Sequence, residues 1–534
     1  MWQQNYTPVA GSLGWSALVA AIPIFVLLYL LGVRRKPAWQ AALAGLASVV
    51  LVAMLFYRMP AVKVASAAAY GAAHGVLPIG WVVFAAILLY RITVETGKFE
   101  IVKDSVGHLS EDRRMQALLI AFAFGAFIEG ASGFGTPVAV AAAMLAGLGF
   151  SPFYAAAICL LANTAPVAFG SIGTPIWALS KVTSLPLNEL SGAVGRICAP
   201  VSLIVPTYLI LVMGGWKALR GVLPGVAVCG ISFAATQYLV SNYIGPELTD
   251  ILSSLAATAS LILLMLVWKP KDEFTLQGNH TAQAAAKRHS TGELLLAWAP
   301  YALLVVSVLL WGLLKPQLGK TTISIPWPGL HELVVQMAPV VREPAPYRAV
   351  YDFTWLAAPG TACFLASIVS ALLLRLSPAG YVRVLVTTVK QLALPMVTIV
   401  CVLALAFLMN YCGATATLGL AFAATGVLFP FFSAMLGWLG VFLTGSDTSA
   451  NALFGNLQVI TASRLNLDPV LMAAANSSGG VMGKMISLQS IAVAAAATGM
   501  KSSEEARLFR FTLRHSIILA SAIGLVTVFY AYAA

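Results

Sequence analysis

The stretch FIEGASGFGTPVA, Phe127–Ala139, lies inside an apolar run that extends from about residue 115 to beyond residue 143. It carries one carboxylate, Glu129, followed by three glycines and a proline within eight residues. Glycine frees the backbone to leave helical geometry, and proline removes a hydrogen-bond donor. The stretch therefore predicts a helix that breaks near mid-membrane and restarts at Pro137, with Thr136 as its N-cap.

The composition of the chain is that of a membrane protein. Of its 534 residues, 60% are hydrophobic and only 9% are charged, which is too few charges to cover a soluble domain. Apolar segments run nearly end to end and predict one all-α polytopic membrane protein with about 12–14 transmembrane helices. The first of these, Leu13 to Gly32, is followed by Arg34, Arg35 and Lys36. That order predicts an uncleaved span with its N-terminus outside.

Several classes of function find no support in the sequence. The formal charge of +12 comes from Lys and Arg in short loops between spans, as the positive-inside rule expects, and no basic stretch has a nucleic-acid-binding pattern. The six cysteines form no close CxxC pair, and the six histidines are scattered. Neither a disulfide framework, a metal site nor a cofactor is expected. Without a P-loop or a nucleophile–base pair, an ATP-driven pump or an enzyme is disfavoured.

A second stretch, TGSDTSANALFGN at Thr444–Asn456, repeats the pattern of the first. Both stretches set a carboxylate among glycines and hydroxyl-bearing residues inside an apolar run. Each is followed about thirty residues later by an Asn-bearing segment, ANTAPVAFGSIGTP at Ala162–Pro175 and ANSSGGVMGK at Ala475–Lys484. Paired, interrupted hydrophobic segments in two halves of a chain are typical of secondary transporters built from inverted repeats with discontinuous or re-entrant helices.

The polar loops divide the chain. We expect a first membrane half at 1–268, with its broken segments at about 115–180, and a second half at 293–534, with its broken segments at about 438–490. Residues 269–292 are the most polar stretch and predict a central cytoplasmic loop. The proline-rich loop Lys315–Tyr351 is expected outside the cytoplasm, and residues 91–114 are expected to hold an amphipathic helix on the membrane surface.

The four predicted breaks offer a site for a small anion, because the N-terminus of a half-helix presents unpaired N–H groups and the positive end of its dipole. The candidate turns are Ser132–Thr136, Asn163–Ala165, Ser446–Ser449 and Asn476–Gly480. Small residues also allow helices to pack closely, which is the alternative interpretation of each turn. The candidate substrate-binding residues are Ser132, Gly133, Gly135, Thr136, Asn163, Thr164, Ser446, Thr448, Ser449, Asn476, Ser477, Ser478 and Lys484.

Glu129 and Asp447 are the candidate proton-coupling groups. A carboxylate at the bilayer centre costs about 2.5–3.5 kcal/mol on insertion scales, so it is paired, protonated or facing water. The alternatives are a structural hydrogen bond for Glu129 and an N-cap for Asp447. Lys484 either neutralises an anion or reaches an interface. His74, alone in a predicted span at about Ala65–Tyr90, fits a packing role better than a proton relay.

The four motifs quoted above closely resemble those of the bacterial L-lactate permease family, and the resemblance covers essentially the whole chain. It implies an inner-membrane symporter that takes up L-lactate, and often D-lactate and glycolate, together with protons. The residues alone imply only an intramembrane site for a small anion. A sodium-coupled carrier of small organic anions is the alternative, because paired Asn and Ser/Thr turns also suit Na⁺. An anion channel is a further alternative.

Overall fold

The computed structural model describes residues 1–107, 109–133, 135–270, 272, 274, 289–341, 343–500 and 502–533. In these residues eleven helices are long and apolar enough to cross a membrane, or up to twelve if a pair bent by 65° forms one span. The predicted all-α membrane protein with discontinuous helices is confirmed, and the span count of eleven to twelve lies just below or at the lower limit of the expected 12–14. The predicted central loop, 269–292, lies mostly outside the described residues.

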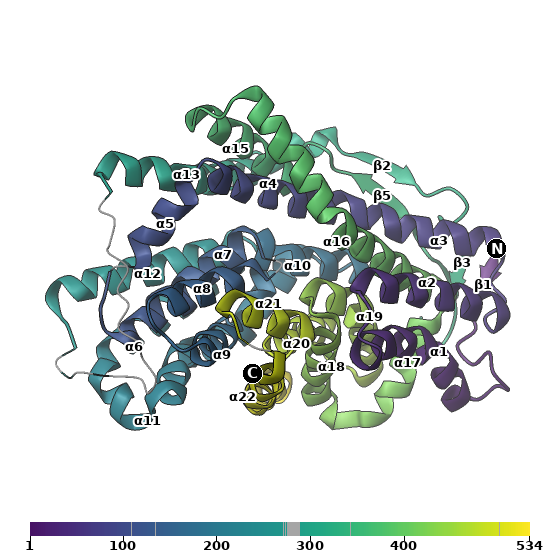
Figure 1. Cartoon of the computed structure of the whole chain (residues 1–534). Helices are drawn as coiled ribbons and strands as arrows, with labels where there is room; N and C mark the ends of the chain where they lie inside the picture. Colours follow the sequence, from purple (N-terminus) through teal and green to yellow (C-terminus); the bar gives the residue numbers. More distant parts are fainter. Residues whose placement is uncertain are drawn as a thin grey trace.

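The first half of the chain runs from β1 to α12 (Figure 1). Its elements are β1 (Trp2–Gln3), α1 (Leu13–Leu28), η1 (Tyr29–Val33), α2 (Ala38–Leu55), α3 (Ala61–His74), η2 (Gly75–Gly80), α4 (Trp81–Glu95), α5 (Lys98–Gly107), α6 (Arg113–Gln116), η3 (Ala117–Phe124), α7 (Gly125–Ala131), α8 (Thr136–Gly147), α9 (Pro152–Ala162), η4 (Val167–Phe169), α10 (Gly170–Thr183), α11 (Leu187–Tyr243) and α12 (Thr249–Val267). The long α11 is interrupted at Gly214–Gly215, between the two spans that the sequence predicts at about Ala193–Met213 and Leu223–Val240.

The second half begins with α13 and ends with α22. Its elements are α13 (Thr291–Leu313), α14 (Lys315–Leu318), η5 (Gly319–Thr321), β2 (Ile323–Pro326), β3 (Val334–Gln336), β4 (Ala345–Pro346), β5 (Val350–Phe353), α15 (Pro359–Leu373), α16 (Pro378–Cys412), α17 (Ala414–Phe422), η6 (Ala423–Leu428), α18 (Phe429–Thr444), α19 (Asp447–Leu465), α20 (Pro469–Lys484), α21 (Leu488–Thr498) and α22 (Ser502–Tyr532).

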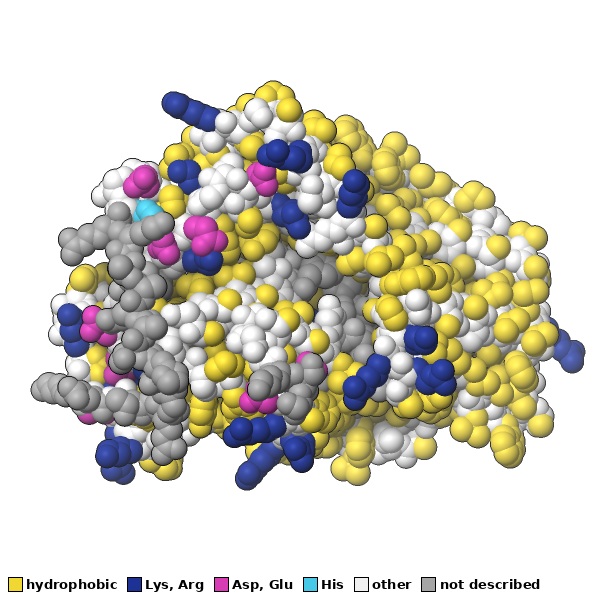
Figure 2. All heavy atoms as spheres, in the orientation of Figure 1, with side chains coloured by type: hydrophobic (Ala, Val, Ile, Leu, Met, Phe, Trp, Pro, Cys, Tyr) yellow, Lys and Arg dark blue, Asp and Glu magenta, His cyan; other side chains and the backbone are white. Residues whose placement is uncertain are grey.

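The helices form two layers (Figure 1). α3, α4, α13 and α15 run along one edge of the molecule, and α16 runs obliquely across this layer, packed against α2, α3 and α4. The broken helices lie in the other layer, where α10 packs on α19 and α21 packs on α8 and α9. These contacts are reciprocal between the repeats. The helix that follows the first break of repeat 1, α8, contacts the helix that follows the second break of repeat 2, α21, and α19 contacts α10 in the same way. Apolar side chains dominate the surface in Figure 2, as lipid-facing helices require.

Two of the predicted breaks lie where the sequence places them. α7 ends at Ala131 and α8 begins at Thr136, while α18 ends at Thr444 and α19 begins at Asp447. The predicted cap at Thr136 is wrong by one residue. Gly135 is the N-cap, with φ of 83°, a left-handed conformation that glycine adopts without strain. Thr136 and Pro137 are instead the first residues of the helix.

The predicted break at Asn476–Gly480 is wrong. α20 continues as a regular helix through these residues and ends at Lys484, and α21 begins at Leu488 with Ser487 as its N-cap. The small residues serve close packing instead, because a Cβ at Gly479 would collide with the backbone of Ala434 on α18. The break therefore lies at 485–487. The predicted turn at Asn163–Ala165 is present: it directly follows α9, which ends at Ala162 with Asn163 as its C-cap.

The N-terminus pairs with the proline-rich loop. β1 runs parallel to β3, which pairs antiparallel with β4, and β2 pairs with β5. The main-chain N–H of Trp2 donates to the carbonyl of Leu333 at 2.9 Å. This pairing puts the N-terminus and the loop on the same side of the membrane. The short strands β2–β5 of this loop were not predicted, because proline cannot donate to a strand ladder and a proline-rich segment indicates irregular structure.

Candidate functional site

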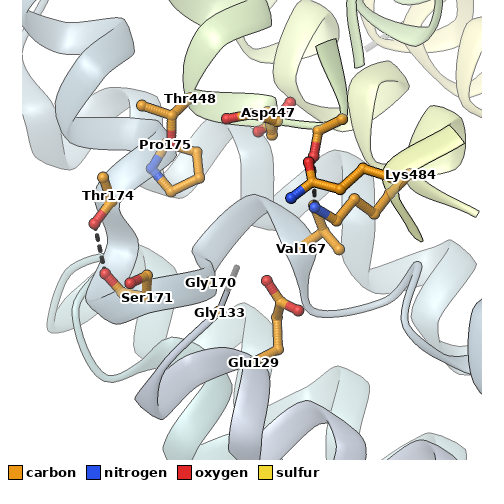
Figure 3. Close-up of a pocket in the computed structure, with 13 residues that line it drawn as sticks. Glu129, Gly133, Val167, Gly170, Ser171, Thr174, Pro175, Asp447, Thr448 and Lys484 are labelled. Carbon is orange, nitrogen blue, oxygen red and sulfur yellow. Dashed lines mark hydrogen bonds between the residues drawn. The ribbon is translucent and has the colours of Figure 1, made fainter. Parts of the chain in front are cut away.

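A small cavity lies where the broken helices of both repeats meet (Figure 3). Its volume is about 60 Å³, and since ~10–15 Å³ suffices for one water molecule, it has room for several waters or a small organic anion. Repeat 1 lines it with residues of α7, η4 and α10, and repeat 2 with residues around the α18–α19 break, α20 and α21. The lining residues are Glu129, Gly133, Val167, Gly170, Ser171, Thr174, Pro175, Gly445, Ser446, Asp447, Thr448, Lys484 and Gln489.

The N-terminal ends of three half-helices border the cavity. Regular helical geometry resumes in α10 at Thr174, after Ser171, Ile172 and Gly173 adopt left-handed conformations. α19 begins at Asp447, and α21 begins next to Gln489. Each end contributes unpaired N–H groups and a partial positive charge. The lining therefore favours a negatively charged ligand.

Glu129 lies in the last turn of α7 and points into the cavity (Figure 3). Its side chain is 4% exposed, and the buried Oε2 has no hydrogen-bond partner in the described structure. Gly170 makes room for it, because a Cβ there would lie 2.6 Å from Oε1. The ammonium of Lys484 and the amide of Asn163, whose own polar atoms are buried without a hydrogen-bond partner in the described structure, are the polar groups that influence this carboxyl group. Of the two acids that line the cavity, Glu129 and Asp447, Glu129 therefore has fewer hydrogen-bond partners.

Asp447 lies in the first turn of α19 and is held by two neighbours. Its Oδ2 accepts a hydrogen bond from the Ser477 hydroxyl at 2.6 Å and one from the Asn451 amide at 3.2 Å. The N-cap of α19 is Ser446, whose hydroxyl accepts from the N–H of Ser449 at 3.3 Å. Asp447 is therefore the first helical residue rather than the cap that the sequence allowed.

Lys484 closes the cavity from the end of α20. Its side chain is 7% exposed, and its Nζ donates to the carbonyl of Gly445 at 2.5 Å, at the C-terminus of α18. It faces Glu129 across the cavity (Figure 3). The other buried cation among the described residues, Arg114, is paired with Asp112 and Asp272 at 2.7 Å each. Lys484 thus provides the unpaired positive charge of the site, and it does not reach an interface.

The structure brings only part of the predicted binding set to the cavity. Gly133, Ser446, Thr448 and Lys484 line it, and Asn163 acts on Glu129 from beside it. The remaining predicted residues have structural contacts or lie outside the lining: Ser132, Gly135, Thr136, Thr164, Ser449, Asn476, Ser477 and Ser478. Ser132 and Thr164, for example, donate to carbonyls of their own helices, those of Ile128 and Leu161.

Asn476 belongs to a ladder of amide side chains between α19 and α20. It donates to Oδ1 of Asn451 at 3.0 Å and accepts from Nε2 of Gln458 at 3.0 Å. Gln458 also donates to the carbonyl of Ser433 on α18. The ladder connects three helices of repeat 2, and both the oxygen and the nitrogen of the Asn476 amide have a hydrogen-bond partner within it.

Asn476→Ala is expected to lower stability and leave substrate affinity nearly unchanged. It leaves buried amides unpaired, at a cost of about 1–3 kcal/mol.

Thr448→Val, in the cavity lining, removes one hydroxyl and should raise the KM for transport roughly tenfold, since a hydrogen bond to a charged group contributes about 1.5 kcal/mol. Thermal melting and uptake kinetics of both variants check this. A tenfold rise in KM for Asn476→Ala would return that residue to the binding site.

Several lining residues were not predicted as binding residues. Ser171, Thr174 and Pro175 belong to the GSIGTP segment, which the sequence flagged only as a break. Its glycines and proline could have placed a helix N-terminus there. Gln489 lies beyond the predicted motif, and it is exposed, so the cavity opens toward the surface at the start of α21. Asp250 was missed as well, because it precedes an apparently ordinary span.

His74 lies away from the cavity in a cage of aromatic rings. Its ring stacks on Phe407 at 5.0 Å and meets Tyr70 and Tyr351 edge to face at 4.8 and 5.0 Å. These contacts agree with the packing role expected from the sequence. Among the described residues no group of His, Cys, Asp and Glu could hold a metal ion.

Comparison with known proteins identifies relatives over the whole length of the chain. A family model described as L-lactate permease matches residues 16–534. The L-lactate permease of Bacillus subtilis is 45% identical over 98% of this chain and 98% of its own length. The glycolate permease GlcA of Escherichia coli is 45% identical over 99% and 98%, and the L-lactate permease of the same strain is 44% identical over 100% and 98%.

A solved structure supports the fold. The Neisseria gonorrhoeae transporter MtrF, described as one of a class of antimetabolite efflux pumps, aligns over 95% of this chain and 97% of its own with a TM-score of 0.50. At 12% identity this likeness concerns the architecture alone. The relatives and the apolar helices together make the protein a multi-pass transporter of the bacterial inner membrane rather than an enzyme. By its full-length match and its relatives, the chain belongs to the L-lactate permease family.

Proposed function

We propose that this protein takes up L-lactate and related 2-hydroxymonocarboxylates, including D-lactate and glycolate, in symport with protons. The observation that carries the proposal is the meeting of Glu129 with Lys484 across a cavity bordered by three helix N-termini. The names of the relatives, which include lactate and glycolate permeases, support the class of substrate. The two halves of the chain, 1–268 and 293–534, would each supply one side of this site.

The cavity suits a small 2-hydroxy acid. Lys484 and the N-termini of α10 and α19 offer positive charge and N–H donors to one carboxylate. The hydroxyl groups of Ser171, Thr174 and Thr448 line the same space and offer partners for the hydroxyl group at position 2. A dicarboxylate would bring a second negative charge that no further described cation of the lining could balance.

Charge balance in the cavity supports coupling to a proton. With both Glu129 and Asp447 ionised, Lys484 would leave the lining with a net charge of about −1, and a bound monocarboxylate would make it about −2. Buried charges without partners are strongly disfavoured. Protonation of one acid removes this repulsion, so a monocarboxylate and a proton bind with positive cooperativity.

Helix dipoles favour Glu129 over Asp447 as the group that carries the proton. Glu129 lies at the C-terminal end of α7, where the negative end of the dipole disfavours a carboxylate. Asp447 lies at the N-terminal end of α19, where the dipole favours a carboxylate and Ser477 and Asn451 donate to it. Glu129 is therefore the group that exchanges its proton, while Asp447 positions the α18–α19 break and contributes secondarily.

The sodium-coupled alternative is less well supported. A helix C-terminus with free carbonyls is a common site for Na⁺ in transporters with broken helices. At the α18–α19 break the carbonyl of Gly445 accepts from Lys484, so a fixed cation already occupies that position.

The purified protein in liposomes tests the proposal. An inward-acid pH gradient should drive labelled lactate above its equilibrium level inside the vesicles, and an inward Na⁺ gradient at equal pH should not. A proton ionophore should abolish the accumulation. Uptake that follows Na⁺ and ignores the pH gradient would overturn the proton assignment, and flux that only equilibrates lactate under either gradient would indicate a channel.

A further inference from the structure

A third buried acid lies behind Glu129, on a helix outside the cavity lining. Asp250 is in the first turn of α12 and is 0% exposed. Both of its carboxyl oxygens are buried and lack a hydrogen-bond partner in the described part of the chain. A buried ionised carboxylate without donors is so unfavourable that such a group takes up a proton instead.

Asp250 lies directly against the helix that carries Glu129. α7 packs on α12, and the contact is made at Gly130, the residue next to Glu129. A Cβ at Gly130 would lie 2.8 Å from the Cβ of Asp250 and 3.1 Å from the main-chain nitrogen of Ile251. The glycine thus permits the approach that brings the two carboxyl groups within electrostatic range of each other.

The titratable groups around Asp250 come from each side. Glu129 on α7 lies within electrostatic range of Asp250, and the thiol of Cys198 on α11 lies within electrostatic range of both Asp250 and Asp447. On its own segment Glu247, three residues earlier, is partly exposed and accepts from the indole N–H of Trp177 on α10 at 3.1 Å. Among the described residues, the charged group that acts on Asp250 is therefore the acid Glu129.

We propose that Asp250 is a second proton-binding group of the transport cycle, coupled to Glu129 so that the two carry at most one negative charge between them. The inference rests on the proposed proton symport. When Glu129 releases its proton, Asp250 stays neutral, because two like charges in one buried place cannot both form. The pair then titrates in two separate steps. Asp250 allows the pair to keep one proton at a pH where Glu129 alone would lose its own.

Asp250→Asn tests the proposal, because the amide keeps the size of the side chain and cannot titrate. In liposomes, pH-driven lactate accumulation should fail at an external pH about one unit or more below the limit of the unmodified protein, since interactions between close carboxyl groups shift titration by that much. Asp250→Glu should restore most of the range. The double variant Glu129→Gln/Asp250→Asn should accumulate no less than Glu129→Gln alone.

Two outcomes distinguish a failure of the proposed role of Asp250 from a failure of the proposed proton symport. If the unmodified protein shows no pH-driven accumulation, the proposed symport fails. If it accumulates lactate and Asp250→Asn keeps the same pH profile, only the role of Asp250 fails. Should Asp250→Asn not fold, infrared spectra of Glu129→Gln serve instead. These spectra should retain the band of a protonated, buried carboxyl group at neutral pH. If that band is absent and a band of an ionised carboxylate appears in its place, the proposal is overturned.

Discussion

Lys484→Met is expected to abolish high-affinity lactate transport. Lys484 supplies the unpaired cation of the described lining, 7% exposed and opposite Glu129. Lys484 and the carboxylate of bound lactate would form a buried charge pair, and truncating one partner of such a pair costs about 2–5 kcal/mol. The KM for lactate should therefore rise by about 30-fold or more, at tenfold for each ~1.4 kcal/mol. Initial uptake rates over a wide range of lactate concentration measure the change.

The matched control is Lys390→Met, which removes an exposed lysine from α16. It should leave KM and uptake unchanged. Lys484→Arg keeps the charge and should retain part of the affinity, although the planar guanidinium cannot reproduce the single contact to Gly445. A normal KM in Lys484→Met, with only a lower melting temperature, would show that the lysine merely holds the α18–α19 break.

Glu129→Gln is expected to separate exchange from accumulation. Glutamine imitates the protonated acid and cannot release a proton, so the substrate still binds but its movement no longer responds to the pH gradient. Exchange of labelled for unlabelled lactate should stay within about tenfold of the unmodified rate, because the barrier changes by no more than about 1.4 kcal/mol. The pH-driven accumulation ratio should fall to about one. Both are measured in the same vesicles.

Glu189→Gln is the control for this change, because Glu189 is an exposed acid in the first turn of α11. It should accumulate lactate normally. Normal accumulation by Glu129→Gln would instead make Glu129 a structural residue and would move the coupling to Asp447 or Asp250.

Local rules predicted the helix ends that depend on the chain itself. The pair Ser151-Pro152 indicates a helix start, since a cap residue followed by proline suits the first turn, and the Ser151 hydroxyl does cap α9 by accepting from the N–H of Tyr154. The breaks after Ala131 and Thr444 follow in the same way from glycines that adopt left-handed conformations, such as Gly135 and Gly445. These features need no knowledge of the neighbouring helices.

The interpretation of Asn476–Gly480 failed because it depends on a neighbour. The same small residues can end a helix or let two helices touch, and α18 lies close enough to require the second. The two acids also proved less alike than the repeat suggested, since Glu129 precedes its break and Asp447 follows its own. Asp250 escaped notice because one acid at the start of an apolar span usually faces water, and only the packing of neighbouring helices, α7 and α11 among them, on α12 buries it.

Proton flux that accompanies lactate tests the central claim most directly. Lactate added outside vesicles of the unmodified protein, with no imposed gradient, should make the external medium more alkaline as protons enter with the anion. Vesicles with Glu129→Gln should exchange labelled lactate without this signal. Alkalinisation of equal size by Glu129→Gln, or none by the unmodified protein during measured lactate uptake, would contradict proton symport through Glu129.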